Sequence, residues 1–475
     1  MRCISDSRIP ADLIQARIAL ESLVIYRQLS QDQPMTELYL LLEHLCLERP
    51  DIFQSIGLYS SLCHKLIKAG SGLKSIITEN IIHADNAFSR AAEIYSAECL
   101  KGSMEAAVKS DLKQLQTIAD LKAEQIKKWI TECCAVEGWQ AEAISSLPVF
   151  PESCVTYNTP EETDFTETSP TDTAFTDGHQ GAYERIMQST CWEDCTEELA
   201  KYHHHWGSGV FSQHRAFVWR RKDRDGCYGD GYFDGVKSPD PITFSNLISY
   251  ELERESVIEN TLRFLKGYPA NNILLYGDRG TGKSSTVKAL VNEYYSEGLR
   301  IIEVPKQLLT DFPVIIGQLA GRNLKFIMFV DDLAFEDNEE NYTALKAALE
   351  GGLESRPQNV LIYATSNRKH LIKEKFSDRA GLVSGNADDE VRAADTIQEK
   401  LSLSDRFGMT VVFSSPNQKR YLEIVEGIIR DRGIQVDTEM LHREALRWEL
   451  RYNGRSPRTA KQFADWLEGH IAVSI

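Results

Sequence analysis

A glycine-rich turn near the middle of the chain has the residue types and the spacing of a phosphate-binding loop. In "LLYGDRGTGKSSTVKAL", residues 274–290, the spacing from Gly277 to Gly282, Lys283 and Ser284 fits the pattern GxxxxGK[ST]. An apolar run precedes the turn and a helical pattern follows it, so the backbone N–H groups of the turn would face an anion at a helix N-terminus. The sequence therefore predicts that this loop holds the phosphates of a nucleotide.

Each residue of this loop has an expected role. The glycines allow a tight turn, the backbone amides and the Lys283 ammonium would hold the β- and γ-phosphates, and the Ser284 hydroxyl would ligate Mg²⁺. The alternative is a chance match in a surface loop, which the flanking strand and helix patterns disfavour. The residues that we expect to contact the nucleotide are Gly277, Asp278, Arg279, Gly280, Thr281, Gly282, Lys283, Ser284 and Ser285.

Two carboxylates follow a second apolar run. "KFIMFVDDL", residues 325–333, reads as a buried strand that ends in Asp331 and Asp332. Asp331 is expected to hold Mg²⁺ through water, as the partner of Ser284, and Asp332 to orient and polarise an attacking water. The alternative is that both carboxylates cap the following turn. A third strand, "NVLIYATSNR", ends in polar residues that could reach the γ-phosphate, so ATP and Mg²⁺ are the predicted cofactors.

The whole chain limits the classes of partner. It has 475 residues with 42% apolar content, enough for several domains, and a formal net charge of -17. This charge argues against broad attraction to nucleic acid or anionic membranes, although a local basic patch could still bind either. No apolar run has the length of a transmembrane helix, and the acidic N-terminal residues do not fit a secretory signal. We therefore expect a cytoplasmic protein without a membrane partner.

The cysteines indicate a reducing compartment. All ten precede the phosphate loop, and they are too sparse for a disulfide framework in a chain of this length. One cluster has possible zinc ligands, but its spacing matches no standard zinc finger, so free thiols and solvent-facing histidines are the favoured interpretation. The cluster consists of Cys191, Cys195, His203, His204 and His205.

Apolar side chains recur at helical spacing in the N-terminal part, which we expect to be all-helical. Two interpretations are possible: a partner-binding helical domain, or helices that pack on one another or on the core, which is the commoner identity of such patterns. The patterns are Ile14, Ile18 and Ile25 with Leu20 and Val24, and then Met104, Val108, Leu112, Leu115 and Ile118.

Composition shifts suggest the remaining boundaries. Between Trp129 and Glu184 there is no Lys or Arg, and residues 152–182 are acidic and rich in Thr and Pro, so we expect them to be disordered. Aromatic residues interspersed with glycine then predict short strands. The expected divisions are a helical domain over 1–150, a linker over 151–183, short strands or an extended arm over 184–245, an α/β nucleotide-binding core over 246–413 and a helical lid over 414–475.

Four segments, taken in order, resemble AAA+ ATPases. They are "PANNILLYGDRGTGKSS", "FVDDLAFE", "ALEGGLESRPQNVLIYATSNR" and "KLSLSDRFG". More closely, they resemble a bacterial AAA+ family catalogued only as a domain of unknown function, over about residues 205–470. The resemblance implies an α/β fold, an AAA+ P-loop NTPase with a parallel sheet core and a small C-terminal helical lid, preceded by an all-helical N-terminal region.

The resemblance also implies roles for particular residues. Asn367 would be the sensor on the strand beside the phosphate-loop strand, Arg406 the arginine finger that reaches a neighbouring subunit's γ-phosphate, and Arg458 the second sensor in the lid. A finger acting in trans implies a homo-oligomer. Many AAA+ enzymes have Asp-Glu where this chain has Asp-Asp, so the carboxylate that polarises water is either Asp332 or Glu336.

The function implied is that of an ATP-hydrolysing AAA+ protein that oligomerises and remodels or switches a macromolecular partner, most simply a protein. The alternative is a slow-turnover adaptor or loader that recruits a protein or nucleic-acid partner. Small-molecule phosphotransfer is a weaker third class, because no acceptor pocket is recognisable. After the second strand of the core there is no aromatic–apolar–glycine loop, which argues against a threading unfoldase. We expect no DNA-binding module after the lid.

Overall fold

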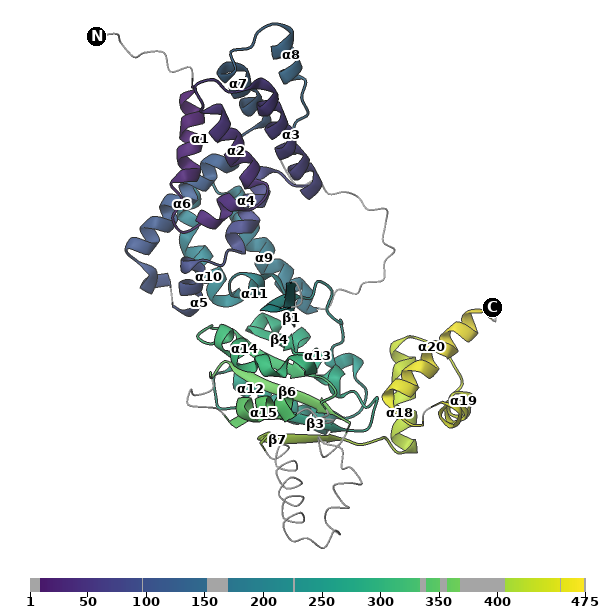
Figure 1. Ribbon diagram of the computed structural model, residues 1–475. Coiled ribbons are helices and arrows are strands. Elements are labelled where there is room, and N and C mark those ends of the chain that lie inside the picture. Colours follow the sequence, from purple (N-terminus) through teal and green to yellow (C-terminus); the bar gives the residue numbers. More distant parts are fainter. Residues whose placement is uncertain are drawn as a thin grey trace, which may run out of the picture. The chain divides into compact units, whose positions relative to one another are not determined.

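The chain divides into two compact units, Met1–Gln213 and His214–Ile475 (Figure 1). The structure is a computed structural model, and the two units are described separately below. The residues that it describes are 9–95, 97–151, 170–224, 227–333, 339–350, 357–367, 406–452 and 454–473.

The described part of the first unit is helical, as predicted for most of it. None of the helices described in either unit is both long enough and apolar enough to cross a membrane. The helices of the first unit are α1 (Ala11–Glu21), α2 (Met35–Leu45), α3 (Ile52–Ala69), α4 (Leu73–Ile82), α5 (Ala87–Ile94), α6 (Ser103–Ala119), α7 (Ala123–Cys133), α8 (Trp139–Ser145), α9 (Pro170–Gln188), α10 (Thr196–Trp206) and α11 (Val210–Gln213).

The two predicted apolar stripes have different outcomes. The stripe on α6 is confirmed for Val108, Leu112, Leu115 and Ile118, which are all buried, whereas Met104 is half-buried. The first stripe is wrong for most of its members: Leu20 is buried, but Ile14, Ile18 and Val24 are exposed. Helix α1 buries Leu13, Ala16 and Ala19 beside Leu20. Apolar residues surround α1 on most sides, so periodicity alone does not determine which face packs.

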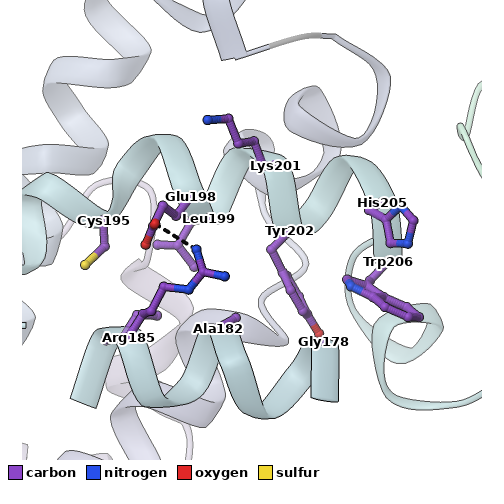
Figure 2. Close-up of a pocket in the computed structure, with 11 residues that line it drawn as sticks. Gly178, Ala182, Arg185, Cys195, Glu198, Leu199, Lys201, Tyr202, His205 and Trp206 are labelled. Carbon is purple, nitrogen blue, oxygen red and sulfur yellow. Dashed lines mark hydrogen bonds and ion pairs between the residues drawn. The ribbon is translucent and has the colours of Figure 1, made fainter. Parts of the chain in front are cut away.

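The prediction of a disordered linker is wrong from Pro170 onward, because helix α9 begins there. Residues 152–169 of the predicted linker lie outside the described ranges. Contacts with α4 and α10 hold α9. A Cβ at Gly178 would come within 2.5 Å of Trp206, so glycine permits close packing on α10, and Arg185 pairs with Glu198 across the two helices (Figure 2). This tertiary packing outweighs a composition that by itself disfavours order.

The segment before Ala216 is also helical rather than extended. Leu199, Tyr202, His203 and Trp206 of α10 are buried at the i, i+3, i+4, i+7 spacing of one helix face. The predicted strands therefore begin only at β1 (Ala216–Arg224). The helical signal was present in the sequence, but the aromatic and glycine content of the neighbouring segment obscured it.

The buried His203 makes the stability of the first unit dependent on pH. Its side chain is fully buried, its Nδ1 lies 3.2 Å from the Gly207 carbonyl oxygen, and burial lowers its pKa to about 4. Below about pH 6.5 the unfolded chain therefore binds more protons than the folded chain. The first unit has its full stability above that pH and loses stability as the pH falls toward about 4.

We expect the wild-type chain to lose about 2 kcal/mol more stability than His203→Gln between neutral pH and about pH 4.5. Urea unfolding followed by circular dichroism at the two pH values measures this difference. His204→Gln, at the exposed neighbouring position, is the control and should follow the wild type. Equal pH dependence of His203→Gln and the wild type would contradict the prediction.

The second unit is built on a seven-stranded sheet with the order β2-β1-β4-β5-β6-β3-β7, among the described residues. All neighbouring pairs are parallel except the hairpin β1–β2. The other strands are β2 (Cys227–Gly235), β3 (Ile273–Gly277), β4 (Leu299–Glu303), β5 (Lys325–Val330), β6 (Val360–Ser366) and β7 (Met409–Phe413). Strand β6 is buried at every position, as expected for a parallel sheet covered on both faces.

Helices complete the second unit, and its last three form the lid at the C-terminal end of the chain (yellow in Figure 1). Helices α18 to α20 contact one another, and their apolar residues join the core that surrounds β3. The helices are α12 (Glu251–Leu265), α13 (Lys283–Tyr294), α14 (Phe312–Leu319), α15 (Glu339–Glu350), α18 (Gln418–Asp431), α19 (Thr438–Arg451) and α20 (Pro457–Val473).

Candidate nucleotide-binding site

The glycine-rich loop joins β3 to α13 in a conformation that requires glycine. Gly277, Gly280 and Gly282 have φ angles of 142°, 77° and 93°, in the left-handed region that disfavours other residues. A Cβ at Gly277 would lie 1.9 Å from the Phe413 carbonyl oxygen. The loop thus turns tightly beside β7 and places the N-terminus of α13 at the carboxyl end of β3, where phosphate groups bind in such folds.

Lys283 is held at the centre of the loop. Its Nζ donates to the carbonyl oxygens of Gly277 at 2.9 Å and Asp278 at 2.7 Å, and to Asn367 Oδ1 at 3.2 Å. Burial lowers the pKa of Lys283, while three nearby carboxylates, among them Asp331, act in the opposite direction. The ammonium is therefore surrounded by oxygen atoms that phosphate oxygens can replace.

The two predicted magnesium ligands are adjacent. The Ser284 hydroxyl donates to Asp331 Oδ1 at 2.6 Å, and Thr365 Oγ1 donates to the same oxygen at 2.6 Å. Asp331 follows β5 and Thr365 lies at the end of β6, the strand between β5 and β3. Hydroxyl and carboxylate oxygens are the ligands that Mg²⁺ accepts together with phosphate, so the residues present fit this ion.

Asp332 occupies a strained backbone position beside the loop. Its φ angle is +51°, which is uncommon for a residue other than glycine, and its amide donates to Thr365 Oγ1 at 2.8 Å. Its carboxylate accepts a hydrogen bond from Asn367 Nδ2 at 2.6 Å and pairs with Lys306 Nζ at 3.5 Å. The backbone of Asp332 thus positions its carboxylate at the site, and the side chains of Asn367 and Lys306 hold it there.

The lid meets the loop directly. The backbone N–H of Arg458, in the first turn of α20, donates to the Gly280 carbonyl oxygen at 3.2 Å. A Cβ at Gly280 would lie 3.0 Å from Arg458 Cβ and 3.1 Å from Ser456 Oγ. The exposed Arg458 side chain therefore starts beside the phosphate loop, and its charge also lowers the pKa of Lys283 slightly.

Arg406 is not brought to this cluster. It precedes β7, whose first residue, Met409, pairs with Ile273 at the start of β3, whereas the phosphate loop follows the other end of that strand. The length of β3 alone separates the two ends by about 13 Å. Glu336, the other candidate for polarising water, lies outside the described residues.

The prediction missed two residues of the site. Lys306 follows β4 and pairs with Asp332, and Ser415 follows β7 and contacts Asp278. The position of each just beyond a strand was the available signal, because parallel strands end at one edge of the sheet. Neither residue belongs to the motif that directed the prediction, and this is why both were overlooked.

The cysteines and histidines of the predicted cluster are part of the first unit. Within the described ranges no group of three or more Cys, His, Asp or Glu side chains is placed to hold a metal ion. Cys191 and Cys195 are free thiols. His204 and His205 are exposed, but the expectation of a solvent-facing side chain is wrong for His203, which packs inside the first unit.

The strand order, the glycine loop after β3, the carboxylates after β5 and the helical lid define an α/β P-loop fold of the AAA+ class. Within that class, the chain belongs to the family described as "Protein of unknown function (DUF815)", whose sequence model matches residues 212–471. This confirms the resemblance to an AAA+ family known only as a domain of unknown function.

Solved structures of RuvB from Thermotoga maritima are similar in fold. One is the RuvB Holliday junction branch migration motor, at 15% identity, and another is a mutant RuvB at 16% identity, both with a TM-score of 0.35. Each match covers 49% of this chain and 66% of the RuvB chain, so the chain spans slightly less than two thirds of these RuvB chains. A search of curated proteins found no match.

Proposed function

We propose that this protein binds ATP in the loop between β3 and α13 and hydrolyses it, and that it works as a homo-oligomer that remodels or switches a macromolecular partner. The observation that carries the proposal is the single hydrogen-bonded cluster formed by Lys283, Ser284, Asp331, Asp332 and Asn367, from three neighbouring strand ends. A phosphate cradle, a metal-binding pair and a carboxylate for water are the parts that ATP hydrolysis requires. The cytoplasmic location remains a prediction.

In this proposal each side chain has one task. The loop amides and Lys283 bind the β- and γ-phosphates, and Ser284 and Asp331 hold Mg²⁺, which supplies positive charge beside the phosphates when bound. Asp332 accepts a proton from the attacking water, and Asn367, which bonds both Lys283 and Asp332, aligns the water with the γ-phosphate. Arg458 adds positive charge from the lid.

One observation favours the slower alternative, a nucleotide-dependent adaptor or loader. The Asp332 carboxylate is already engaged by Lys306 and Asn367, and these contacts occupy the oxygen atoms that would accept a proton from water. Hydrolysis would then be slow until a partner separates Lys306 from Asp332. ATPase rates with and without a bound partner distinguish the two functions, because a motor has a substantial basal rate and an adaptor has a low one.

The choice of general base gives a direct test of the proposed hydrolysis. We expect Asp332→Asn to bind ATP normally and to hydrolyse it at least on the order of a hundredfold more slowly, because the amide cannot accept the proton. Glu336→Gln, four residues further along, is the matched control and should retain the wild-type rate. Phosphate release measures the rate, and a fluorescent ATP analogue measures binding. Loss of hydrolysis in Glu336→Gln with an active Asp332→Asn would show the assignment to be wrong.

A further inference from the structure

Asp278, the second residue of the phosphate loop, is joined to the start of the lid. Its carboxylate oxygen Oδ2 accepts the Ser415 backbone N–H at 2.9 Å and the Ser415 hydroxyl at 2.7 Å. These hydrogen bonds lower the pKa of Asp278, so the carboxylate is charged at neutral pH. A negative side chain in a loop that receives phosphates opposes their binding, so its position needs an explanation other than contact with the nucleotide.

Ser415 lies in the short connection between the core and the lid. It follows β7 by two residues and precedes α18, which begins at Gln418. The backbone oxygen of the preceding residue, Ser414, accepts a hydrogen bond from the buried Tyr250 at 2.6 Å, which holds the core side of the connection. A contact between the phosphate loop and Ser415 can therefore influence the orientation of the lid helices that follow.

The backbone of Asp278 is joined to Lys283. The three N–H donors of the Lys283 ammonium are all used, by the carbonyl oxygens of Gly277 and Asp278 and by Asn367. Phosphate oxygens can bond to Lys283 only if at least one of these three contacts is given up. The contact with the Asp278 carbonyl oxygen is the shortest of the three, and it belongs to the same residue that holds Ser415.

We propose that Asp278 is a latch between the phosphate loop and the lid, which holds Ser415 until Lys283 turns from the Asp278 carbonyl oxygen to a bound phosphate. Asp278 then leaves Ser415, and the lid moves as a consequence of phosphate binding. The inference rests on the proposed function, since it assigns a regulatory role to a residue of that site. The bond to Ser415 stabilises the latched conformation alone, so removing it favours the nucleotide-bound conformation.

The first test is the affinity of Ser415→Ala for a fluorescent ATP analogue. This variant removes the hydroxyl contact without changing the charge of the loop, and we expect its Kd to fall about fivefold, the effect of losing one charge-assisted hydrogen bond at an exposed position. In Asp278→Ala chains, the added Ser415→Ala change should have no further effect. Ser414→Ala, which keeps the backbone contact with Tyr250, is the control. Unchanged or weaker binding by Ser415→Ala would overturn the latch.

The second test needs no nucleotide. Because Lys283 holds the Asp278 carbonyl oxygen, Lys283→Ala should release Ser415 and speed hydrogen exchange of its amide about fivefold, whereas Lys288→Ala on the same helix should not. Unchanged exchange in Lys283→Ala would overturn the coupling even if ATP binds as proposed. If the wild-type chain binds no ATP analogue, both the proposed function and the proposed release of Asp278 by a bound phosphate are overturned. The hydrogen-exchange measurement would still show whether Lys283 and Ser415 are coupled.

Discussion

Arg406→Ala is expected to bind ATP normally and to hydrolyse it about a thousandfold more slowly. The reason is geometric. Arg406 lies before β7, at the opposite end of β3 and β7 from the loop of its own chain, so its guanidinium would act on the nucleotide of a neighbouring subunit. An arginine supplied in trans stabilises the charge that develops on the transferred phosphoryl group, and it contributes to hydrolysis without contributing to ground-state binding.

Mixing two inactive variants tests whether Arg406 acts across an interface. Asp332→Asn subunits keep an intact finger beside an inactive site, and Arg406→Ala subunits keep an intact site without a finger. Where the two meet, one composite site is complete, so the mixture should regain ATPase activity that neither variant has alone. Arg263→Ala serves as the control, because this exposed arginine pairs with Glu259 within α12 and is not part of the site.

Two results would refute the in-trans role. If Arg406 only pairs with a carboxylate of its own chain, mixing recovers nothing and Arg406→Ala lowers the unfolding temperature instead. Full ATPase activity of a strictly monomeric chain at high dilution would likewise show that no neighbouring subunit is needed.

Lys283→Ala is expected to weaken ATP binding by a factor of about a hundred or more. The ammonium is buried among oxygen atoms at the centre of the loop, where alanine leaves no positive charge for the β- and γ-phosphates. Titration with a fluorescent ATP analogue gives the affinity, and circular dichroism shows whether the variant is folded.

Lys288→Ala is the matched control for this substitution. Lys288 lies on the same helix as Lys283 but on its exposed side, where it pairs with Asp240 at 3.4 Å. It should therefore bind ATP with wild-type affinity. A folded Lys283→Ala chain with an affinity close to that of the wild type would refute the assignment of the loop as the nucleotide site.

The local parts of this protein could be predicted from its sequence alone. The phosphate loop is contiguous, and its glycines, Lys283 and Ser284 have roles that follow from their spacing, so the strand, turn and helix could be predicted together. The carboxylates after β5 and the polar end of β6 were also predictable, because an apolar run that stops at a polar residue indicates a strand end. Parallel strands bring such ends to one edge of the sheet.

Contacts between side chains far apart in the sequence could not be predicted from local patterns. The pairs Lys306–Asp332 and Asp278–Ser415 join residues 26 and 137 positions apart, and no local pattern encodes such a separation. The same holds for α9, whose acidic and Thr-rich sequence disfavours order until Gly178 packs on Trp206. In each case the stabilisation comes from groups on another element, so the outcome depends on how the elements pack and not on the residues of the segment alone.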